Sequence, residues 1–363
     1  MTGHSLFAPL SLGRGPMLKN RFVLAPLTNS QSHPDGRLSG DEFNWLTLRA
    51  RGGFGLTMTC AAHVQAIGQG FPGQLGVYAD EQLEGLSQLA EGIRAYESVA
   101  VIQLHHAGMR SPEELIGEAP VCPSANEETG ARALLPAEVE GLIEDFVAAA
   151  ERAERAGFDG VEIHGAHGYV VCQFLSSEIN RRSDRFGGSL ENRSRVLFEI
   201  IDGIRERCRP DFVLGVRLSA ERFGIELGEA IELSQRLMNE GKIDFLDMSL
   251  WDVFKEPAEE AFGGRTLLSY FSELERGDVR LGVAGKIYGA RDARACLDAG
   301  VDFVIAGRAA ILHHDFPEKV RVDENFEATK LPVSPDYLRG EGLGEAFVRY
   351  MANWPGFVDP APD

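Results

Sequence analysis

The sequence predicts a single α/β domain folded as a (β/α)₈ TIM barrel, and three observations support this prediction. Eight short apolar runs alternate with helical stretches along the chain. The runs lack sustained polar alternation, which is typical of strands buried on both faces of a parallel sheet. Gly157, Gly241 and Gly300 stand between a helical stretch and the next run, where a left-handed residue turns the chain back. An open doubly wound sheet is the alternative, but no GxGxxG turn follows the first run.

The predicted strands, in chain order, are residues 21–27, 56–61, 99–104, 160–164, 212–218, 245–249, 280–284 and 303–307. Apolar residues recur at spacings of three and four over 83–93, 139–150 and 197–204, which predicts helices packed on one side. Ser39 and Glu42 predict a capping box that opens the first helix. Two long segments, 110–135 and 251–265, follow the third and sixth strands, at the face where barrels keep their chemistry.

Composition excludes several classes of protein. The 363 residues carry a net charge of −19, from 36 basic and 55 acidic residues, so we expect no nucleic-acid or membrane-surface binding. Five scattered cysteines without a CxxC predict neither a disulfide framework nor a cysteine-rich metal site, and they favour a reducing compartment. Without a signal peptide or an apolar run of about 20 residues, the expected location is cytoplasmic.

The densest polar cluster, His164, His167 and Tyr169, directly follows the fourth predicted strand. One histidine could simply cap a loop, and a His-x-x-His pair could bind a metal, but no HExxH pattern supplies further ligands. We favour a third interpretation and expect no metal. Two neutral imidazoles can donate hydrogen bonds to an oxygen that gains negative charge, and a phenol can then supply a proton.

Further polar residues mark strands three and five. Gln103 and Arg217 lie inside these runs, and a buried arginine needs a partner. A structural ion pair with Glu162 is one interpretation; a fixed positive charge beside an anionic cofactor is the other. Pro26 predicts that the first strand's ladder stops there and that its backbone becomes available.

The last two strands end in Gly285-Lys286 and Gly307-Arg308. Barrels often bind phosphate with the loops after strands seven and eight, through backbone N–H groups and added positive charge. Together with Gln103 and Arg217, these loops indicate a phosphorylated planar cofactor across the mouth of the barrel.

These residues resemble the old yellow enzyme family of FMN-dependent ene-reductases, and most closely its bacterial xenobiotic-reductase-like branch. The resemblance runs from Leu18 to about Arg321, and its most specific segments are GFDGVEIHGAHGYVVCQFLS at 157–176 and NRRSDRFGGSLENRSR at 180–195. It implies that residues 1–330 form an FMN-binding barrel. Residues 331–363 are then a C-terminal extension that packs on the barrel or on a neighbouring subunit of a monomer or homo-oligomer.

The resemblance also implies roles for individual residues. The implied FMN contacts are Ala25, Pro26, Leu27 and Thr28 along the flavin ring, Cys60 beside it, Gln103 on its pyrimidine edge, Arg217 facing N1 and O2, and Gly285, Lys286, Gly307 and Arg308 around the phosphate. His164 and His167 are implied to hold the oxygen of an unsaturated substrate, and Tyr169 to donate the proton.

The implied activity is an NAD(P)H:flavin oxidoreductase that reduces the C=C bond of α,β-unsaturated carbonyl or nitro compounds. NADPH or NADH reduces the FMN; hydride passes from flavin N5 to the β-carbon of the small alkene, and Tyr169 protonates the α-carbon. Two alternatives stay open. One is another FMN reaction on the same barrel, such as a catabolic reduction or demethylation. The other is a flavin-binding protein without turnover.

The chain departs from the family pattern at several positions. Thr28 stands where the branch with two histidines usually has cysteine, and Ser30 replaces an aromatic substrate contact. The family's usual Gly-Arg after the third strand is Gly108-Met109-Arg110 in this chain.

Overall fold

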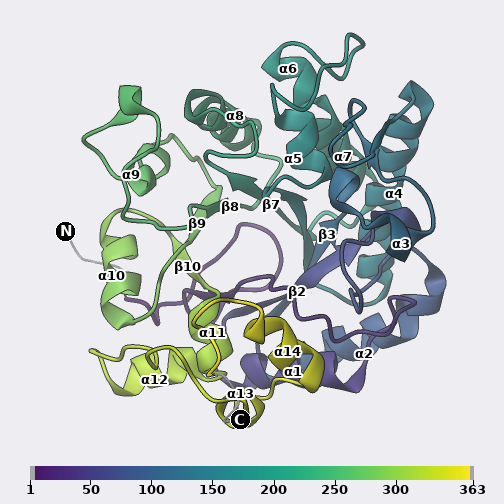
Figure 1. The fold of residues 1–363 in the computed structure, drawn as a ribbon. Helices are drawn as coiled ribbons and strands as arrows, with labels where there is room; N and C mark the ends of the chain where they lie inside the picture. The colour runs from purple at the N-terminus through teal and green to yellow at the C-terminus, as the bar shows by residue number, and fades with distance from the viewer. Residues whose placement is uncertain (1–4, 360–363) are drawn as a thin grey trace.

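Eight parallel strands close into the predicted barrel in the computed structural model, which describes residues 5–359 (Figure 1). In order around the barrel they are β1 (Phe22–Leu24), β2 (Leu56–His63), β3 (Val99–His105), β6 (Gly160–Gly165), β7 (Val213–Ser219), β8 (Phe245–Ser249), β9 (Arg280–Ala284) and β10 (Phe303–Ala306), which pairs with β1. Each strand coincides with a predicted run, and the fold class is confirmed. β1 is the shortest: its ladder ends when the Ala25 N–H donates to Ala306 O at 3.0 Å, because Pro26 has no N–H to continue it.

A layer of helices surrounds the strands (Figure 1). Those that follow a barrel strand or its loop are α1 (Gly40–Arg51), α2 (Leu83–Arg94), α4 (Pro136–Arg155), α7 (Arg195–Arg207), α8 (Leu227–Glu240), α9 (Leu267–Ser272), α10 (Ala290–Asp298) and α11 (Arg308–Leu312). The helices predicted from apolar periodicity are confirmed as α2, α4 and α7. Gly157, Gly241 and Gly300 have φ values of 89°, 61° and 99°, so the predicted left-handed turns are confirmed.

The first helix begins as predicted, but its capping box is only half formed. The Ser39 side chain accepts a hydrogen bond from the Glu42 N–H at 3.1 Å. The Glu42 side chain points instead into the protein, where it is fully buried and accepts from Asn29 at 3.2 Å. The competing buried hydrogen bonds explain why this side chain does not return to the N-terminus of its own helix.

The N-terminal end of the barrel is closed by the chain's own first segment. Leu10 and Leu18 pair as an antiparallel bridge, with backbone hydrogen bonds of 3.0 and 2.9 Å. Together with Leu12 they join an apolar cluster that includes Leu56 and Val99, the first residues of β2 and β3. A site for a ligand is therefore left to the opposite end, where the strands terminate.

The two long segments at the C-terminal face contain short elements. The segment 110–135 follows η3 (Gly108–Arg110) and includes α3 (Glu113–Ile116) and a two-stranded sheet of β4 (Val121–Cys122) and β5 (Arg132–Ala133). The segment 251–265 contains η4 (Glu260–Phe262). After β6 come α5 (Val170–Leu175) and α6 (Leu190–Arg193), and η1 (Ala66–Gly68) and η2 (Asp80–Gln82) follow β2.

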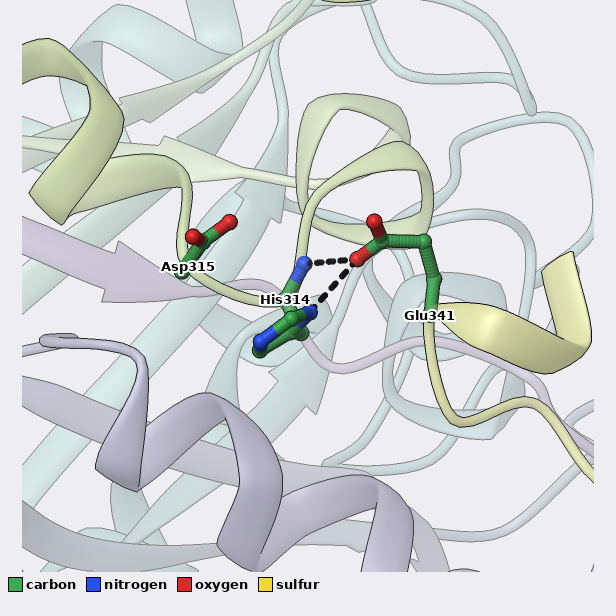
Figure 2. Close-up of side chains that lie close together, drawn as sticks. All are labelled: His314, Asp315 and Glu341. Atoms are coloured by element: carbon green, nitrogen blue, oxygen red, sulfur yellow. Dashed lines mark hydrogen bonds and ion pairs between the residues drawn. The ribbon is translucent and has the colours of Figure 1, made fainter. Parts of the chain in front are cut away.

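The C-terminal segment folds back on the barrel of the same chain through α12 (Phe316–Val322), α13 (Pro335–Gly340) and α14 (Glu345–Ala352). Phe347 of α14 packs edge-on against Trp45 of α1, with ring centroids 4.8 Å apart. Figure 2 shows Glu341 accepting from both the backbone N–H and the Nδ1 of His314, each at 2.7 Å. These contacts attach residues that follow the barrel to its first and last helices.

Within residues 5–359, no helix combines the length and the apolar character needed to cross a bilayer.

Candidate active site

A cavity of about 280 Å³ opens at the C-terminal ends of the barrel strands. It is lined by Ala25, Pro26, Leu27, Thr28, Ala61, Phe71, Gln103, His164, His167, Tyr169, Arg217, Ser249, Trp251, Ala284, Gly285, Lys286, Ile287, Tyr288, Ile305, Gly307, Arg308, Ile311, Tyr350, Met351 and Trp354. Every residue that the sequence analysis assigned to a site therefore lines one cavity, with the exception of Cys60.

Cys60 faces away from this cavity, and its expected place beside the flavin is corrected. Its thiol is buried and donates to Glu42 Oε1 at 2.9 Å. Burial, followed by the nearby Glu42 carboxyl, raises the pKa of Cys60 well above its usual value. Successive side chains of a strand point to opposite faces, so the next residue, Ala61, lines the cavity instead.

The imidazoles of His164 and His167 meet at the end of β6. His167 Nδ1 lies 3.2 Å from His164 Nε2, and His167 Nε2 lies 2.8 Å from the Ser249 hydroxyl oxygen. The Ala166 N–H points at His164 Nδ1 from 3.3 Å. Because a backbone N–H can only donate, His164 Nδ1 accepts, and its Nε2 carries the proton. His164 is thus a donor that faces the cavity.

Burial is the largest cause that lowers the pKa of His164 and His167 well below the usual histidine range, and the Arg217 and Arg110 guanidiniums and a neighbouring imidazole lower it further. Both rings are neutral at physiological pH. A ligand oxygen that enters between them can take over the His164 Nε2–H. His167 can donate from Nδ1 as well, because the Ser249 hydroxyl is able to donate to Nε2 in exchange.

Tyr169 stands beside this pair. Its ring centroid is 5.0 Å from that of His164 and 4.3 Å from that of His105. Among the described residues its hydroxyl has no hydrogen-bond partner, although the side chain is largely buried. Burial raises the pKa of Tyr169, so the phenol is protonated and its O–H is available to a bound molecule.

A network of buried polar groups lies on the neighbouring strands. Arg217 Nε is 2.9 Å from Asp247 Oδ2, and Gln103 Nε2 donates to Glu162 Oε1 at 2.6 Å. Asp247 is therefore the direct ionic partner of Arg217, and the interpretation that pairs Arg217 with Glu162 names the wrong carboxylate. Register explains this correction: Arg217 of β7 lies opposite Asp247 of β8, whereas Glu162 of β6 lies opposite Gly215.

Burial raises the pKa of Asp247 to about 6 and that of Glu162 well above its usual value. The Arg217 guanidinium opposes both shifts. Arg217 also lines the cavity, so its ion pair and its access to a ligand coexist.

The loops after β9 and β10 form the other end of the cavity. Lys286 is exposed and pairs with Asp252 at 2.9 Å, while the Arg308 guanidinium lies 5.8 Å from the ring centroid of Tyr288. Although acidic residues far outnumber basic ones in this chain, the described residues that line the cavity include Arg217, Lys286 and Arg308 and not one aspartate or glutamate.

This distribution fits FMN. An apolar strip, Ala25 to Leu27, suits a flat ring, an amide and a guanidinium suit its polar edge, and the two cationic loops suit a phosphate.

A second group of residues that are able to bind a metal lies outside the cavity. Ligand atoms of His314, Asp315 and Glu341 come within 4.8 Å of one another (Figure 2). None of the three lines the cavity, and the Glu341 hydrogen bonds to His314 already account for their proximity.

The sequence did not predict the aromatic wall of the cavity. Tyr350, Met351 and Trp354 come from α14 and the residues after it, and Trp251 and Tyr288 come from the loops after β8 and β9. The spacing of Phe347, Tyr350 and Trp354 is helical and could have predicted α14. No local pattern could have predicted that this helix packs against α1 and brings Tyr350 and Met351 to the cavity.

Comparison with known proteins gives a consistent result. Residues 5–327 match the NADH:flavin oxidoreductase / NADH oxidase family. The chain is 36% identical over 327 residues to the probable NADH-dependent flavin oxidoreductase YqiG of Bacillus subtilis (strain 168), covering 87% of each protein. It is 33% identical over 343 residues to an NADPH dehydrogenase of the same organism, covering 92% of this chain and 98% of that protein. Morphinone reductase in complex with tetrahydroNAD superposes with a TM-score of 0.78 at 29% identity, over 99% of both chains.

Proposed function

We propose that this chain, which belongs to the NADH:flavin oxidoreductase / NADH oxidase family, reduces the C=C bond of α,β-unsaturated carbonyl or nitro compounds. The premise is that it is an NAD(P)H-dependent FMN oxidoreductase of the old yellow enzyme type. Bound FMN supplies the hydride, which it obtains from NAD(P)H. The chain's own residues bind the cofactor, hold the alkene and deliver a proton.

In this proposal the cavity lining divides between the two ligands. Ala25, Pro26, Leu27, Thr28 and Ala61 lie along the flavin ring. The polar edge of the ring meets Gln103 and Arg217, and the fixed charge of Arg217 favours negative charge on that edge. The phosphate lies at the loops that carry Gly285, Lys286, Gly307 and Arg308.

The alkene lies at the imidazole side of the cavity. His164 and His167 are neutral, so each can donate one hydrogen bond to the carbonyl or nitro oxygen of the alkene. That oxygen gains negative charge as the reaction proceeds, and donors already in place stabilise the charge without reorganising. The Tyr169 hydroxyl then protonates the α-carbon.

One observation carries the proposal. The Tyr169 phenol, which has no hydrogen-bond partner within residues 5–359, stands beside two neutral imidazoles in a cavity whose described lining contains no carboxylate. A protein that only stored flavin would have no use for a proton donor at this place. A different FMN reaction on the same barrel remains the second candidate, and substrate turnover distinguishes it.

The central test is Tyr169→Phe, which keeps the ring and removes the proton. We expect alkene reduction to slow by about 10²–10⁴-fold, the usual contribution of a general acid. Flavin reduction by NAD(P)H should keep its rate, because that step transfers no proton from Tyr169. Rapid-mixing absorbance measurements follow the two half-reactions separately.

Tyr270→Phe is the matched control, since it removes a hydroxyl that bonds to Phe262 O outside the cavity. Equal slowing of both half-reactions in Tyr169→Phe would contradict the proton-donor role. A panel of enones, enals, maleimides and nitroalkenes, with NADPH and with NADH, tests the activity itself. Absence of turnover on all of them would overturn the proposed function.

A further inference from the structure

We propose that Arg110 is a positioning residue for this reaction, whose guanidinium holds the His167 loop in place and stabilises the anion that Tyr169 becomes when it gives up its proton. The inference rests on the proposed function, because it takes Tyr169 as the proton donor. It is carried by the contacts of Arg110, by the backbone of the loop it touches, and by its lack of an acidic partner.

Arg110 is the last residue of η3, the turn that follows β3, and it reaches across to the end of β6. Its Nη1 donates to the carbonyl oxygen of His167 at 2.5 Å. Its Cζ lies 4.6 Å from the ring centroid of Tyr169. A single exposed guanidinium therefore contacts both the oxygen-binding histidine and the proton donor.

The loop that receives this hydrogen bond has an unusual backbone. His167 has a φ of 61°, a left-handed conformation that a residue with a side chain adopts at an energetic cost, and Gly168 follows with 72°. Two further contacts hold the turn: the His167 N–H donates to Ser219 Oγ at 3.0 Å, and Gln173 Nε2 donates to Gly168 O at 2.8 Å. Arg110 adds a third contact, because it donates a hydrogen bond to the His167 carbonyl oxygen. Together these contacts hold the backbone of His167 and so the direction of its imidazole.

The charge of Arg110 is directed at the site. Within residues 5–359, no carboxylate lies at ion-pair distance from it, unlike Arg217, which is paired with Asp247. The groups around the Tyr169 phenol are Arg110, Arg217, Tyr350 and the neutral rings of His105 and His164. Burial raises the pKa of Tyr169, and Arg110 is the first of two cations that act against this rise.

The proton transfer explains why such a cation matters. The O–H bond of Tyr169 breaks, its proton forms the new C–H bond at the α-carbon, and the electron pair stays on the phenolate oxygen. Water then returns a proton to the phenolate. In the interval a negative charge occupies a largely buried side chain, which burial alone disfavours. A guanidinium beside the phenolate attracts its negative charge, and an exposed ion pair of this kind contributes a factor of about two to five.

Two substitutions separate the hydrogen bond from the charge. Arg110→Gln keeps an N–H donor for His167 but is neutral, whereas Arg110→Lys keeps the positive charge. The FMN-loaded full-length protein is labelled with 3-fluorotyrosine, whose phenol ionises at lower pH than tyrosine, and is titrated by ¹⁹F NMR. The Tyr169 resonance is assigned by its absence in Tyr169→Phe.

We expect Arg110→Gln to move the Tyr169 titration midpoint to higher pH and to slow alkene reduction by about two- to five-fold, with flavin reduction unchanged. Arg110→Lys should return both quantities toward the wild-type values. The titration does not depend on alkene turnover. It therefore tests the interaction between Arg110 and Tyr169 even if no alkene is reduced and the proposed function fails.

A wild-type titration midpoint in Arg110→Gln would overturn the proposal. Equal changes in the Gln and Lys variants would overturn it as well, because they would trace the effect to the shape of the guanidinium and not to its charge.

Discussion

Two groups of polar side chains each contribute residues to the lining of the same cavity, and burial shifts the pKa values of the two groups in opposite directions. We call the first the imidazole cluster: His63, His105, His106, His164 and His167. Burial lowers the pKa of each of these residues, to about 4 for His63 and about 3 for His106. The cluster holds no carboxylate, so it stays neutral and offers hydrogen bonds without a permanent charge.

We call the second the ion network: Gln103, Glu162, Arg217 and Asp247. Here burial raises the carboxyl pKa values, and the Arg217 guanidinium 2.9 Å from Asp247 counteracts it. Under the proposed function the difference has a chemical reason. Charge on a substrate oxygen is transient, so neutral donors suffice, whereas a cofactor edge that must accept negative charge needs a fixed cation with its own partner.

The largest expected effect comes from breaking the ion network. Arg217→Met leaves Asp247 and Glu162 buried without their cation, and we expect it to cost about 3–5 kcal/mol of unfolding free energy. FMN binding should weaken as well. Denaturant unfolding of the apoprotein and FMN titration measure the two effects separately.

A double variant sharpens this test. Replacing both partners with apolar residues, Arg217→Met with Asp247→Leu, should recover part of this stability, because only Glu162, which keeps its hydrogen bond from Gln103, then lacks the cation. The double variant should not restore FMN binding. Normal FMN affinity in Arg217→Met would show that the ion pair serves the fold alone.

The next effect is a pH dependence of the free energy of unfolding, to which the imidazole cluster and the ion network contribute with opposite signs. An unfolded histidine binds a proton below about pH 6.5, whereas buried His63 and His106 do so only near pH 4 and 3. Below about pH 6.5 protonation therefore favours the unfolded state, and each of these histidines lowers the free energy of unfolding by about 2 kcal/mol between pH 7 and pH 5. Asp247 acts in the opposite sense between about pH 4 and 6, because its raised pKa lets the folded state keep the proton.

Comparing wild type with His106→Gln isolates one histidine from these opposing contributions. The variant should lose about 2 kcal/mol less unfolding free energy between pH 7 and pH 5. Denaturant unfolding at the two pH values measures this difference. An unchanged pH dependence would mean that His106 has the same pKa in the folded and the unfolded protein.

The smallest effect concerns the imidazole cluster itself. Neither ring nitrogen of His105 has a hydrogen-bond partner among the described residues, although the side chain is fully buried. Replacing such a group with an apolar one of similar shape is neutral or stabilising, so we expect His105→Phe to change the unfolding free energy by about 0 to +1 kcal/mol.

His106→Phe provides the contrast in a thermal unfolding measurement. His106 Nδ1 accepts a hydrogen bond from the Gly108 N–H at 2.9 Å. His106→Phe removes this acceptor and leaves the Gly108 N–H without a partner, so it should destabilise the protein. Clear destabilisation by His105→Phe would reveal a polar partner for that ring.

Much of the barrel could be predicted because its information is local. Strand burial, helix periodicity and the glycines at helix ends each depend on neighbouring residues, as Pro26 does when it ends the ladder of β1. The position of His164, His167 and Tyr169 was equally predictable, because the end of a parallel strand in a barrel leads to one face.

Other features required the tertiary structure. Sequence alone left Arg217 without a definite partner, and only the register of β7 with β8 brought it to Asp247. Cys60 and Ala61 are neighbours in sequence, yet only the orientation of β2 decided which one lines the cavity. Trp354 reaches the cavity because Phe347 packs against Trp45, some 300 residues earlier in the chain. Backbone conformation follows from nearby residues, whereas contacts between distant segments depend on how the whole barrel packs, and the partners of a buried charge are among those contacts.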